Sequence, residues 1–186
     1  MLTICFKTTP LKIGEWIILR LPEGASAKLP SRGMTLVEGT INGCRSKIVL
    51  EPDGKGSHWF RVDSGLRQVA GIDTGGTVTI AVEPSKEWPE PEIPADLKKA
   101  LESDQQANAL WVEITPMARW DWLRWICATN NRETRSHRIE VAMSKLKSGE
   151  RRPCCFNRNQ CTEPEVSKNG VLIGPAQTTS QERRRR

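Results

Sequence analysis

The stretch EPSKEWPEPEIP, residues 83–94, divides the chain into two halves whose hydrophobic residues repeat with different periods. It contains four prolines and four glutamates. Proline fixes φ and favours an extended polyproline conformation, so a segment of this composition is a semi-rigid connector. We therefore predict a proline-rich linker at residues 84–93. It joins a β domain at residues 1–83 to a helical domain at residues 94–149.

Before the linker, short runs of β-forming residues alternate with tight turns. Asn42-Gly43 is a strong two-residue hairpin signal, and Leu66, Val69 and Ala70 indicate one or two helical turns. Small barrels are built from short strands of this kind, and closure of the sheet removes its exposed edges. We therefore expect a small N-terminal β-barrel. Its six predicted strands are residues 2–7, 16–21, 34–41, 44–50, 58–62 and 77–82.

After the linker the apolar residues recur with a helical period. Thr115-Pro116 is a strong start signal, because a hydroxyl cap precedes proline at the first helical position. We expect helices from residue 94 to about 101, over 106–112, over 116–129 and over 133–147. Residues 150–176 form a Cys-containing tail, and residues 177–186 are expected to be a disordered basic C-terminus. The predicted fold class is α+β, a β-barrel followed by a helical domain.

Composition indicates a soluble globular protein, with 37% hydrophobic and 27% charged residues among 186. No apolar run approaches the roughly 20 residues that span a bilayer, and MLTICFKTTP at the start lacks the features of a signal peptide. We therefore expect a cytoplasmic protein with no membrane insertion. The net charge of +6 lies wholly in the second half of the chain. This asymmetry suggests an anionic partner, although a solvated helix face would give the same pattern.

The segment WDWLRW, residues 120–125, gives its predicted helix two apolar faces. At 100° per residue, Trp120 lies opposite Trp122 and Trp125. Aromatic helix faces usually belong to the core, so we favour a helix covered on both sides. The alternative is a presented tryptophan face that stacks on bases or docks a partner. The candidate residues for ligand or partner binding are Trp122, Trp125, Arg124, Arg135 and Arg138.

Arg135 lies on the apolar side of the last predicted helix, and a half-buried arginine needs a partner. We predict Asp121 as this partner, with Glu113 or Glu140 as alternatives. An inter-helix ion pair is the favoured interpretation. An arginine fork for a carboxylate or phosphate ligand is the other one.

Three cysteines of the tail, Cys154, Cys155 and Cys161, are weak candidates for a zinc site. Adjacent cysteines chelate one ion poorly, and a tetrahedral site needs four ligands. Cys127 or His137 would complete the site only if the fold delivered it. We therefore favour reduced structural thiols and expect no cofactor.

No catalytic constellation is visible in the sequence. His58 and His137 are isolated, which favours neither a metal triad nor a Ser-His-Asp arrangement. We found no nucleophile with a base at a meaningful spacing, so we expect a protein that is not an enzyme.

The helical half resembles the YdeI/OmpD-associated family, also called bacteriocin-protection proteins. The resemblance is carried by PADLKKALESDQQANALW (94–111), ITPMARWDWLRWI (114–126) and ETRSHRIEVAMSKLKSG (133–149). LPEGASAKL (21–29) and GIDTGGTVTIAVE (71–83) resemble the barrel family called domain of unknown function 1905 (DUF1905), which often precedes it. The resemblance implies a cytosolic bacterial protein with a link to antimicrobial-peptide resistance and to an outer-membrane porin. It supplies no catalytic residues.

Two classes of function follow from these observations. The first is a non-enzymatic binding or stress-protection module for a peptide, a protein or a small ligand. The alternative is a nucleic-acid-binding protein that uses the basic helical half. Its candidate residues are Arg119, Arg124, Arg132, Arg135, Arg138, Arg151 and Arg152.

Overall fold

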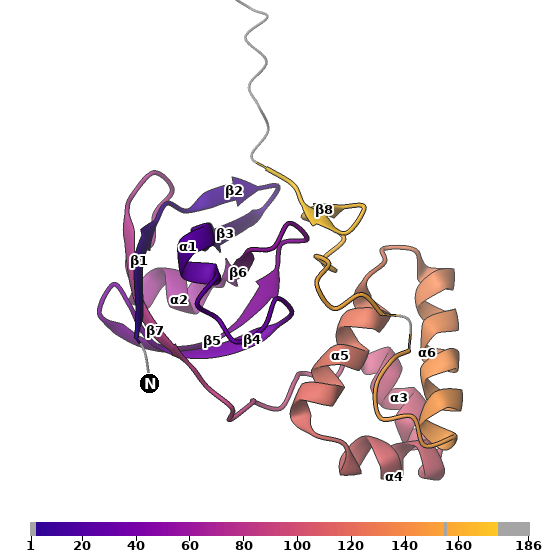
Figure 1. Ribbon diagram of the computed structural model, residues 1–186. Helices are drawn as coiled ribbons and strands as arrows, with labels where there is room; N and C mark the ends of the chain where they lie inside the picture. Colours follow the sequence, from indigo (N-terminus) through magenta and orange to yellow (C-terminus); the bar gives the residue numbers. More distant parts are fainter. Residues whose placement is uncertain (1–2, 155, 175–186) are drawn as a thin grey trace, which may run out of the picture.

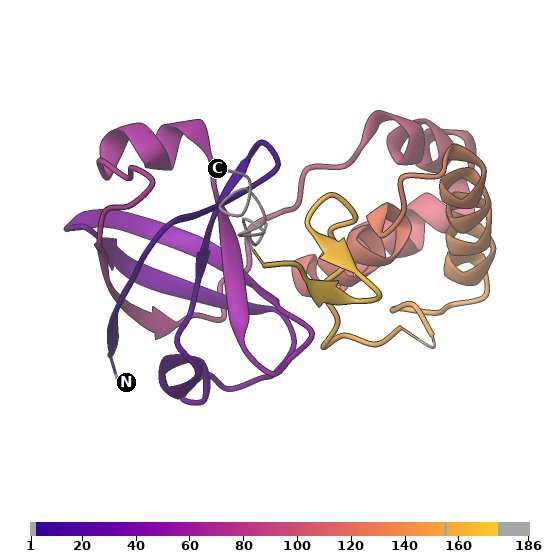
Figure 2. The same ribbon diagram turned by 90° about the horizontal axis from the view of Figure 1, so that it is seen from above.

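In the computed structural model, residues 3–154 and 156–174 are described. Their first half is a curved antiparallel sheet of seven strands, in the order β1-β7-β4-β5-β6-β3-β2. The sheet curls into a half-barrel, with the short helices α1 (Glu23–Ser26) and α2 (Ser64–Val69) beside it (Figures 1 and 2). The strands are β1 (Ile4–Thr8), β2 (Leu11–Ile13), β3 (Trp16–Arg20), β4 (Thr35–Ile41), β5 (Cys44–Pro52), β6 (His58–Val62) and β7 (Val78–Pro84).

The strand pattern confirms the predicted β architecture and adds two elements to it. The extra strand β2 has three residues and pairs with β3 through Leu11↔Ile18 and Ile13↔Trp16. Three residues are too few for an alternating pattern to be recognised, and α1 is a single turn of four residues. The predicted first strand began at residue 2, which lies outside the described residues.

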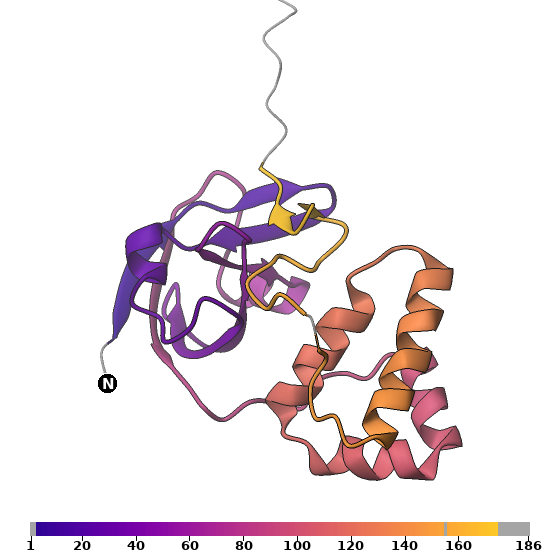
Figure 3. The same cartoon turned by 45° about the vertical axis from the view of Figure 1, so that its right-hand side comes forward.

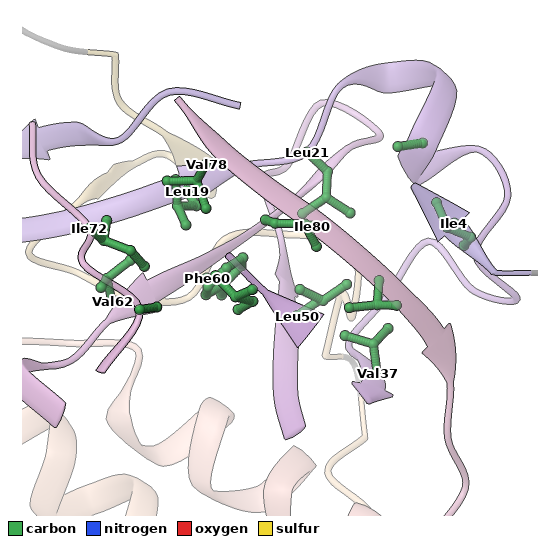
Figure 4. Close-up of a cluster of buried hydrophobic side chains, with 14 of the residues drawn as sticks. Ile4, Leu19, Leu21, Val37, Leu50, Phe60, Val62, Ile72, Val78 and Ile80 are labelled. Atoms are coloured by element: carbon green, nitrogen blue, oxygen red, sulfur yellow. The ribbon is translucent and has the colours of Figure 1, made fainter. Parts of the chain in front are cut away.

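The inner face of the sheet carries the larger of the two main cores (Figure 4). Val78, Ile80 and Val82 point into it from β7, as their alternation predicted, and each is at most 3% exposed. Period-2 alternation places such residues on one face of a strand, and burying that face stabilises the sheet. The other buried members are Ile4, Leu19, Leu21, Ala25, Leu29, Val37, Ile41, Leu50, Phe60, Val62, Ala70 and Ile72.

Four helices follow the linker: α3 (Ala95–Ser103), α4 (Gln105–Glu113), α5 (Pro116–Cys127) and α6 (Arg132–Lys147). Side-chain caps start three of them. Asp104, Thr115 and Asn131 accept hydrogen bonds from the backbone N–H groups three residues later, and each bond satisfies a donor that the helix leaves free. The predicted start of α5 at Thr115-Pro116 is confirmed.

The helix α5 is covered on two sides. Trp122 and Ile126 are fully buried in the helical core, together with Trp111 of α4. On another side of the same helix, the Trp120 indole donates a hydrogen bond to the carbonyl of Pro89 in the linker (2.9 Å). The core interpretation is therefore confirmed for Trp122, which is not presented to a partner.

The tail returns from the helices to the sheet and lies between them (Figures 1 and 3). It forms a small hairpin of β8 (Ser167–Lys168) and β9 (Val171–Leu172), which the sequence did not predict. The backbone N–H of Leu172 donates to the carbonyl of Asp53 at 2.9 Å. A third core follows from this contact, because Cys161, Val166 and Leu172 of the tail pack on Ile13, Ile18 and Trp59 of the sheet.

Among the described residues, no helix combines the length and the apolar character needed to cross a membrane.

Gly54 allows a test of the docked tail, because a Cβ built there would lie 2.1 Å from the carbonyl oxygen of Gly170. Gly56 is the matched control: it also has a positive φ, but a Cβ there meets nothing within 4 Å. Alanine is disfavoured at a positive φ, so both variants lose stability for this reason. Only Gly54→Ala also places a Cβ against the backbone of the tail. We expect Gly54→Ala to lose about 1–3 kcal/mol more unfolding free energy than Gly56→Ala in urea titrations. Equal losses would show that the tail does not pack against this turn.

Candidate functional site

The guanidinium of Arg124 is buried where the sheet, the helices and the tail meet. Its side chain is 3% exposed, and its Nε lies 2.9 Å from Oε2 of Glu51 on β5, whose side chain is 14% exposed. The contact is an ion pair without the alignment of a hydrogen bond. The Nη2 group donates to the carbonyl of Gln160 (3.0 Å) and Nη1 to that of Arg158 (3.4 Å). One side chain of α5 thus contacts both the sheet and the tail.

Two carboxyl groups near this guanidinium have raised pKa values. Burial raises the pKa of Glu51, and the charge of Arg124 opposes this effect. Burial, followed by the charge of Glu51, raises the pKa of Glu163 to about 7, while Arg124 and Arg61 lower it and Glu165 adds to the increase. Desolvation dominates because the charged form loses water contacts in the interior. This junction therefore takes up a proton near neutral pH.

Asp121 of α5 is 2% exposed, and its Oδ2 lies 3.5 Å from Nη1 of Arg152 and 3.6 Å from Nε of Arg158. Burial raises the pKa of Asp121, and the nearby arginine charges lower it. Like Arg124, this carboxylate binds the tail to the helix.

The predicted partner of Arg135 was wrong. Arg135 forms a two-pronged ion pair with Asp96 of α3, with Nε–Oδ2 at 2.6 Å and Nη2–Oδ1 at 3.0 Å, and donates to Sγ of Cys127. Asp96 lies in the first turn of α3, which packs beside the start of α6, whereas Asp121 faces the tail. The two alternatives fail as well: Glu113 binds Arg151, and Glu140 lies near His137. The Arg135 fork is therefore occupied by a residue of the chain.

A cleft of about 590 Å³ lies beside the tail, between the end of α5 and the tail loops. Trp125 of α5 and Arg138 of α6 line one wall, and both are among the predicted site residues. Nη1 of Arg138 donates to the Trp125 carbonyl (2.8 Å), and its guanidinium carbon lies 5.7 Å from the centre of a Trp125 ring. The remaining predicted site residues, Trp122, Arg124 and Arg135, are absent from the described lining.

The tail supplies most of the other wall. Its lining residues are uncharged and offer amide, hydroxyl, thiol and aromatic groups, and no carboxylate occurs in the described lining. The hydroxyl of Thr162, a residue only 9% exposed, has no hydrogen-bond partner among the described residues. Apart from Cys161, which was a candidate zinc ligand, sequence patterns did not indicate these residues, because the tail lacks periodicity and meets α5 only in three dimensions. They are Phe156, Asn157, Gln160, Cys161, Thr162, Pro164, Ser167, Asn169 and Gly170.

The predicted zinc ligands do not gather in the part of the chain that the structure describes. Cys161 is 3% exposed, and burial raises the pKa of its thiol to about 11. Cys154 is exposed, and Cys155 lies outside the described residues. No group of three or more His, Cys, Asp or Glu residues that could hold a metal occurs within residues 3–154 and 156–174. Of the two candidates for a fourth ligand, His137 is exposed on α6, and Sγ of Cys127 accepts a hydrogen bond from Arg135.

His58 is not isolated, contrary to the sequence interpretation. Its Nδ1 lies 2.7 Å from Oγ of Ser26 and its Nε2 lies 2.8 Å from the carbonyl of Gly33. Since a carbonyl only accepts, Nε2 carries the proton and Nδ1 accepts from the serine hydroxyl. Both side chains are fully buried, and burial lowers the pKa of His58. The pair resembles part of a hydrolase device, but both side chains are 0% exposed.

Most of the arginines proposed for nucleic-acid binding are paired with carboxylates of the chain, and these pairs reduce the positive charge offered to a phosphate backbone. The pairs are Arg119–Glu90, Arg124–Glu51, Arg135–Asp96, Arg151–Glu113 and Arg152–Asp121.

Comparison with known families identifies both halves of the chain. Residues 4–82 match the family described as domain of unknown function (DUF1905), and residues 90–149 match the family described as bacteriocin-protection, YdeI or OmpD-associated. The chain therefore carries a DUF1905 domain followed by a YdeI/OmpD-associated domain, as the resemblance implied. The tail, which forms much of the cleft, lies beyond both matches. No protein with a curated description matches the chain.

The pKa of Glu163 predicts a specific dependence of stability on pH. A carboxyl with a pKa near 7 in the folded state and about 4.3 in the unfolded state is protonated only in the folded state between these values. Its contribution to the unfolding free energy therefore falls as pH rises through this interval. We expect the unfolding free energy of the wild type relative to Glu163→Gln to be larger at pH 5 than at pH 8.

The control for this experiment is Glu102→Gln, at an exposed position of α3. Relative to this control, the wild type should show the same difference in unfolding free energy at pH 5 and pH 8. Buried His58 contributes to the unfolding free energy with the opposite dependence on pH, because burial lowers its pKa. This contribution is the same in the wild type and in each variant, so it cancels when the two are compared at one pH. A wild-type advantage over Glu163→Gln that stays constant, or that grows with pH, would contradict the assignment.

Proposed function

We propose that this pairing of a DUF1905 domain with a YdeI/OmpD-associated domain is a non-enzymatic binding module that holds a short peptide segment in the cleft beside Trp125. We place this activity in the bacterial cytoplasm, as the family resemblance implies. The observation that carries the proposal is the chemistry of the cleft, where aromatic surface and neutral hydrogen-bonding groups converge.

The cleft suits a peptide in size and in chemistry. Its volume of about 590 Å³ lies within the range of roughly 300–1,000 Å³ found for ligand pockets. Side-chain amides such as those of Asn157 and Gln160 both donate and accept hydrogen bonds, as a peptide backbone does. Trp125 and Phe156 add apolar surface for a side chain. The name of the matched family, bacteriocin-protection, agrees with a peptide ligand, because bacteriocins are peptides or proteins.

The residues of the cleft favour binding over catalysis. The described lining contains neither a histidine nor a carboxylate, the usual general bases. Cys161 contributes to the lining, but with a pKa of about 11 it remains a thiol at neutral pH and is a poor nucleophile. The protein would then protect the cell by sequestering the peptide, because a bound peptide cannot reach its target.

The test uses N-acetylated tetrapeptides of randomised sequence, prepared without Asp or Glu, as a mixture of free acids and C-terminal amides. We expect members of this mixture to bind the full chain with micromolar affinity and to change its tryptophan fluorescence. Trp125→Ala should weaken the affinity at least tenfold. Trp88→Ala, which removes a half-buried linker tryptophan outside the described lining, should not change it.

Two outcomes would overturn the proposed function. One is the absence of any bound tetrapeptide at millimolar concentration. The other is unchanged affinity in Trp125→Ala. Salt-sensitive binding of single-stranded DNA in place of peptides would instead support the nucleic-acid alternative.

A further inference from the structure

Resting on the proposed peptide-binding function, we infer that the cleft recognises the free C-terminal carboxylate of its peptide and that Arg138 is the cation that binds it. Three features of the described residues support this inference: no carboxylate among them neutralises Arg138, none of them adds a competing carboxylate to the lining, and none of them is a hydrogen-bond partner of the Thr162 hydroxyl.

Arg138 differs from the arginines around it. Arg124 and Arg135 each have a carboxylate of the chain within 3 Å, at Glu51 and Asp96. No carboxylate of the described residues forms an ion pair with Arg138, and its one hydrogen bond within these residues uses Nη1. A guanidinium has five N–H donors, so most of its donor capacity remains for a ligand. Its charge is also half-buried, and an anion would offset the cost of this desolvation.

The bond to the Trp125 carbonyl holds the Arg138 guanidinium in place before any ligand arrives. An arginine with a fixed plane presents paired N–H groups that match the two oxygens of a carboxylate, and less side-chain entropy is lost on binding. The guanidinium also lies beside the Trp125 ring, at 5.7 Å from the ring centre. A carboxylate bound to Arg138 would therefore bring the side chain of the same residue close to this indole.

Thr162 provides a second, independent indication of a polar ligand. Its hydroxyl is buried without a partner in the described chain, although Thr162 lines the cleft. An unsatisfied buried hydroxyl costs free energy, and a rotation of the Thr162 side chain that brought it to a ligand oxygen or N–H in the cleft would relieve this cost.

The charge of the lining favours a carboxylate over a phosphate. Arg138 is the sole charged side chain among the described residues of the cleft. One cation balances a carboxylate, whereas a phosphate group of charge near −2 would retain excess negative charge. A single negative charge is therefore the better match.

The experiment compares three sets of N-acetylated tetrapeptides on the full chain. The first set carries free C-terminal acids, the second carries C-terminal amides, and neither contains Asp or Glu. The third set has C-terminal amides and a glutamate fixed at its last position. We expect the free acids to bind the wild type at least tenfold more tightly than either set of amides.

Two variants test whether Arg138 produces the preference for free C-terminal acids over amides. Arg138→Gln should bind acids and amides with equal affinity, whereas Arg132→Gln, which removes an exposed arginine from the start of the same helix, should retain the preference. Thermal unfolding checks that Arg138→Gln is folded. The comparison of acids with amides on the wild type does not depend on this variant.

Each alternative result overturns a defined part of the account. Equal binding of acids and amides by the wild type would overturn the C-terminal inference and leave peptide binding intact. Glutamate-containing amides that bind as tightly as free acids would show that any carboxylate suffices. A preference that persists in Arg138→Gln would overturn the role of Arg138. Failure of all three sets to bind would overturn the proposed function itself.

Discussion

A buried guanidinium cannot rely on water, so the contacts around Arg124 determine how the parts of this protein are held together. Its ion pair with Glu51 connects α5 to the sheet, and its hydrogen bonds to the carbonyls of Gln160 and Arg158 connect α5 to the tail. Removing one partner of such a group leaves an uncompensated charge in the interior. The sheet, the helices and the tail are therefore energetically coupled through one side chain.

The tail has a larger role than its irregular structure suggests. It lies beyond both family matches, yet it completes a core against Trp59 and provides most of one wall of the cleft. The proposed ligand site is consequently a property of this chain as a whole, since Trp125 and Arg138 come from the matched helical domain and Thr162 comes from the tail. Any change that displaces the tail should alter the site without touching its helical wall.

The features that the sequence predicted are those set by local interactions. The four helices, the cap at Thr115 and the alternation of β7 follow from residues within a turn or two of each other. The sequence also placed Trp125 and Arg138 in a candidate site. It missed the partner of Arg135 and the Ser26–His58 pair, because these contacts join residues 32 or more positions apart. It also missed the wall of the cleft that the tail forms, because the tail has no periodic pattern. Spacing along a helix carries no information about which element packs against it.

Amide hydrogen exchange in the tail measures whether Arg124 holds this segment against the sheet and the helices. The backbone N–H of Leu172 donates to the carbonyl of Asp53 and reports on the contact between the tail and the sheet. The backbone N–H of Cys161 donates to the carbonyl of Gly170 and reports on the fold of the tail itself. We expect these amides to exchange at least tenfold faster in Arg124→Met than in the wild type, with a smaller change in the amides of β4 and β7. Unchanged protection of Cys161 and Leu172 in Arg124→Met would contradict the account.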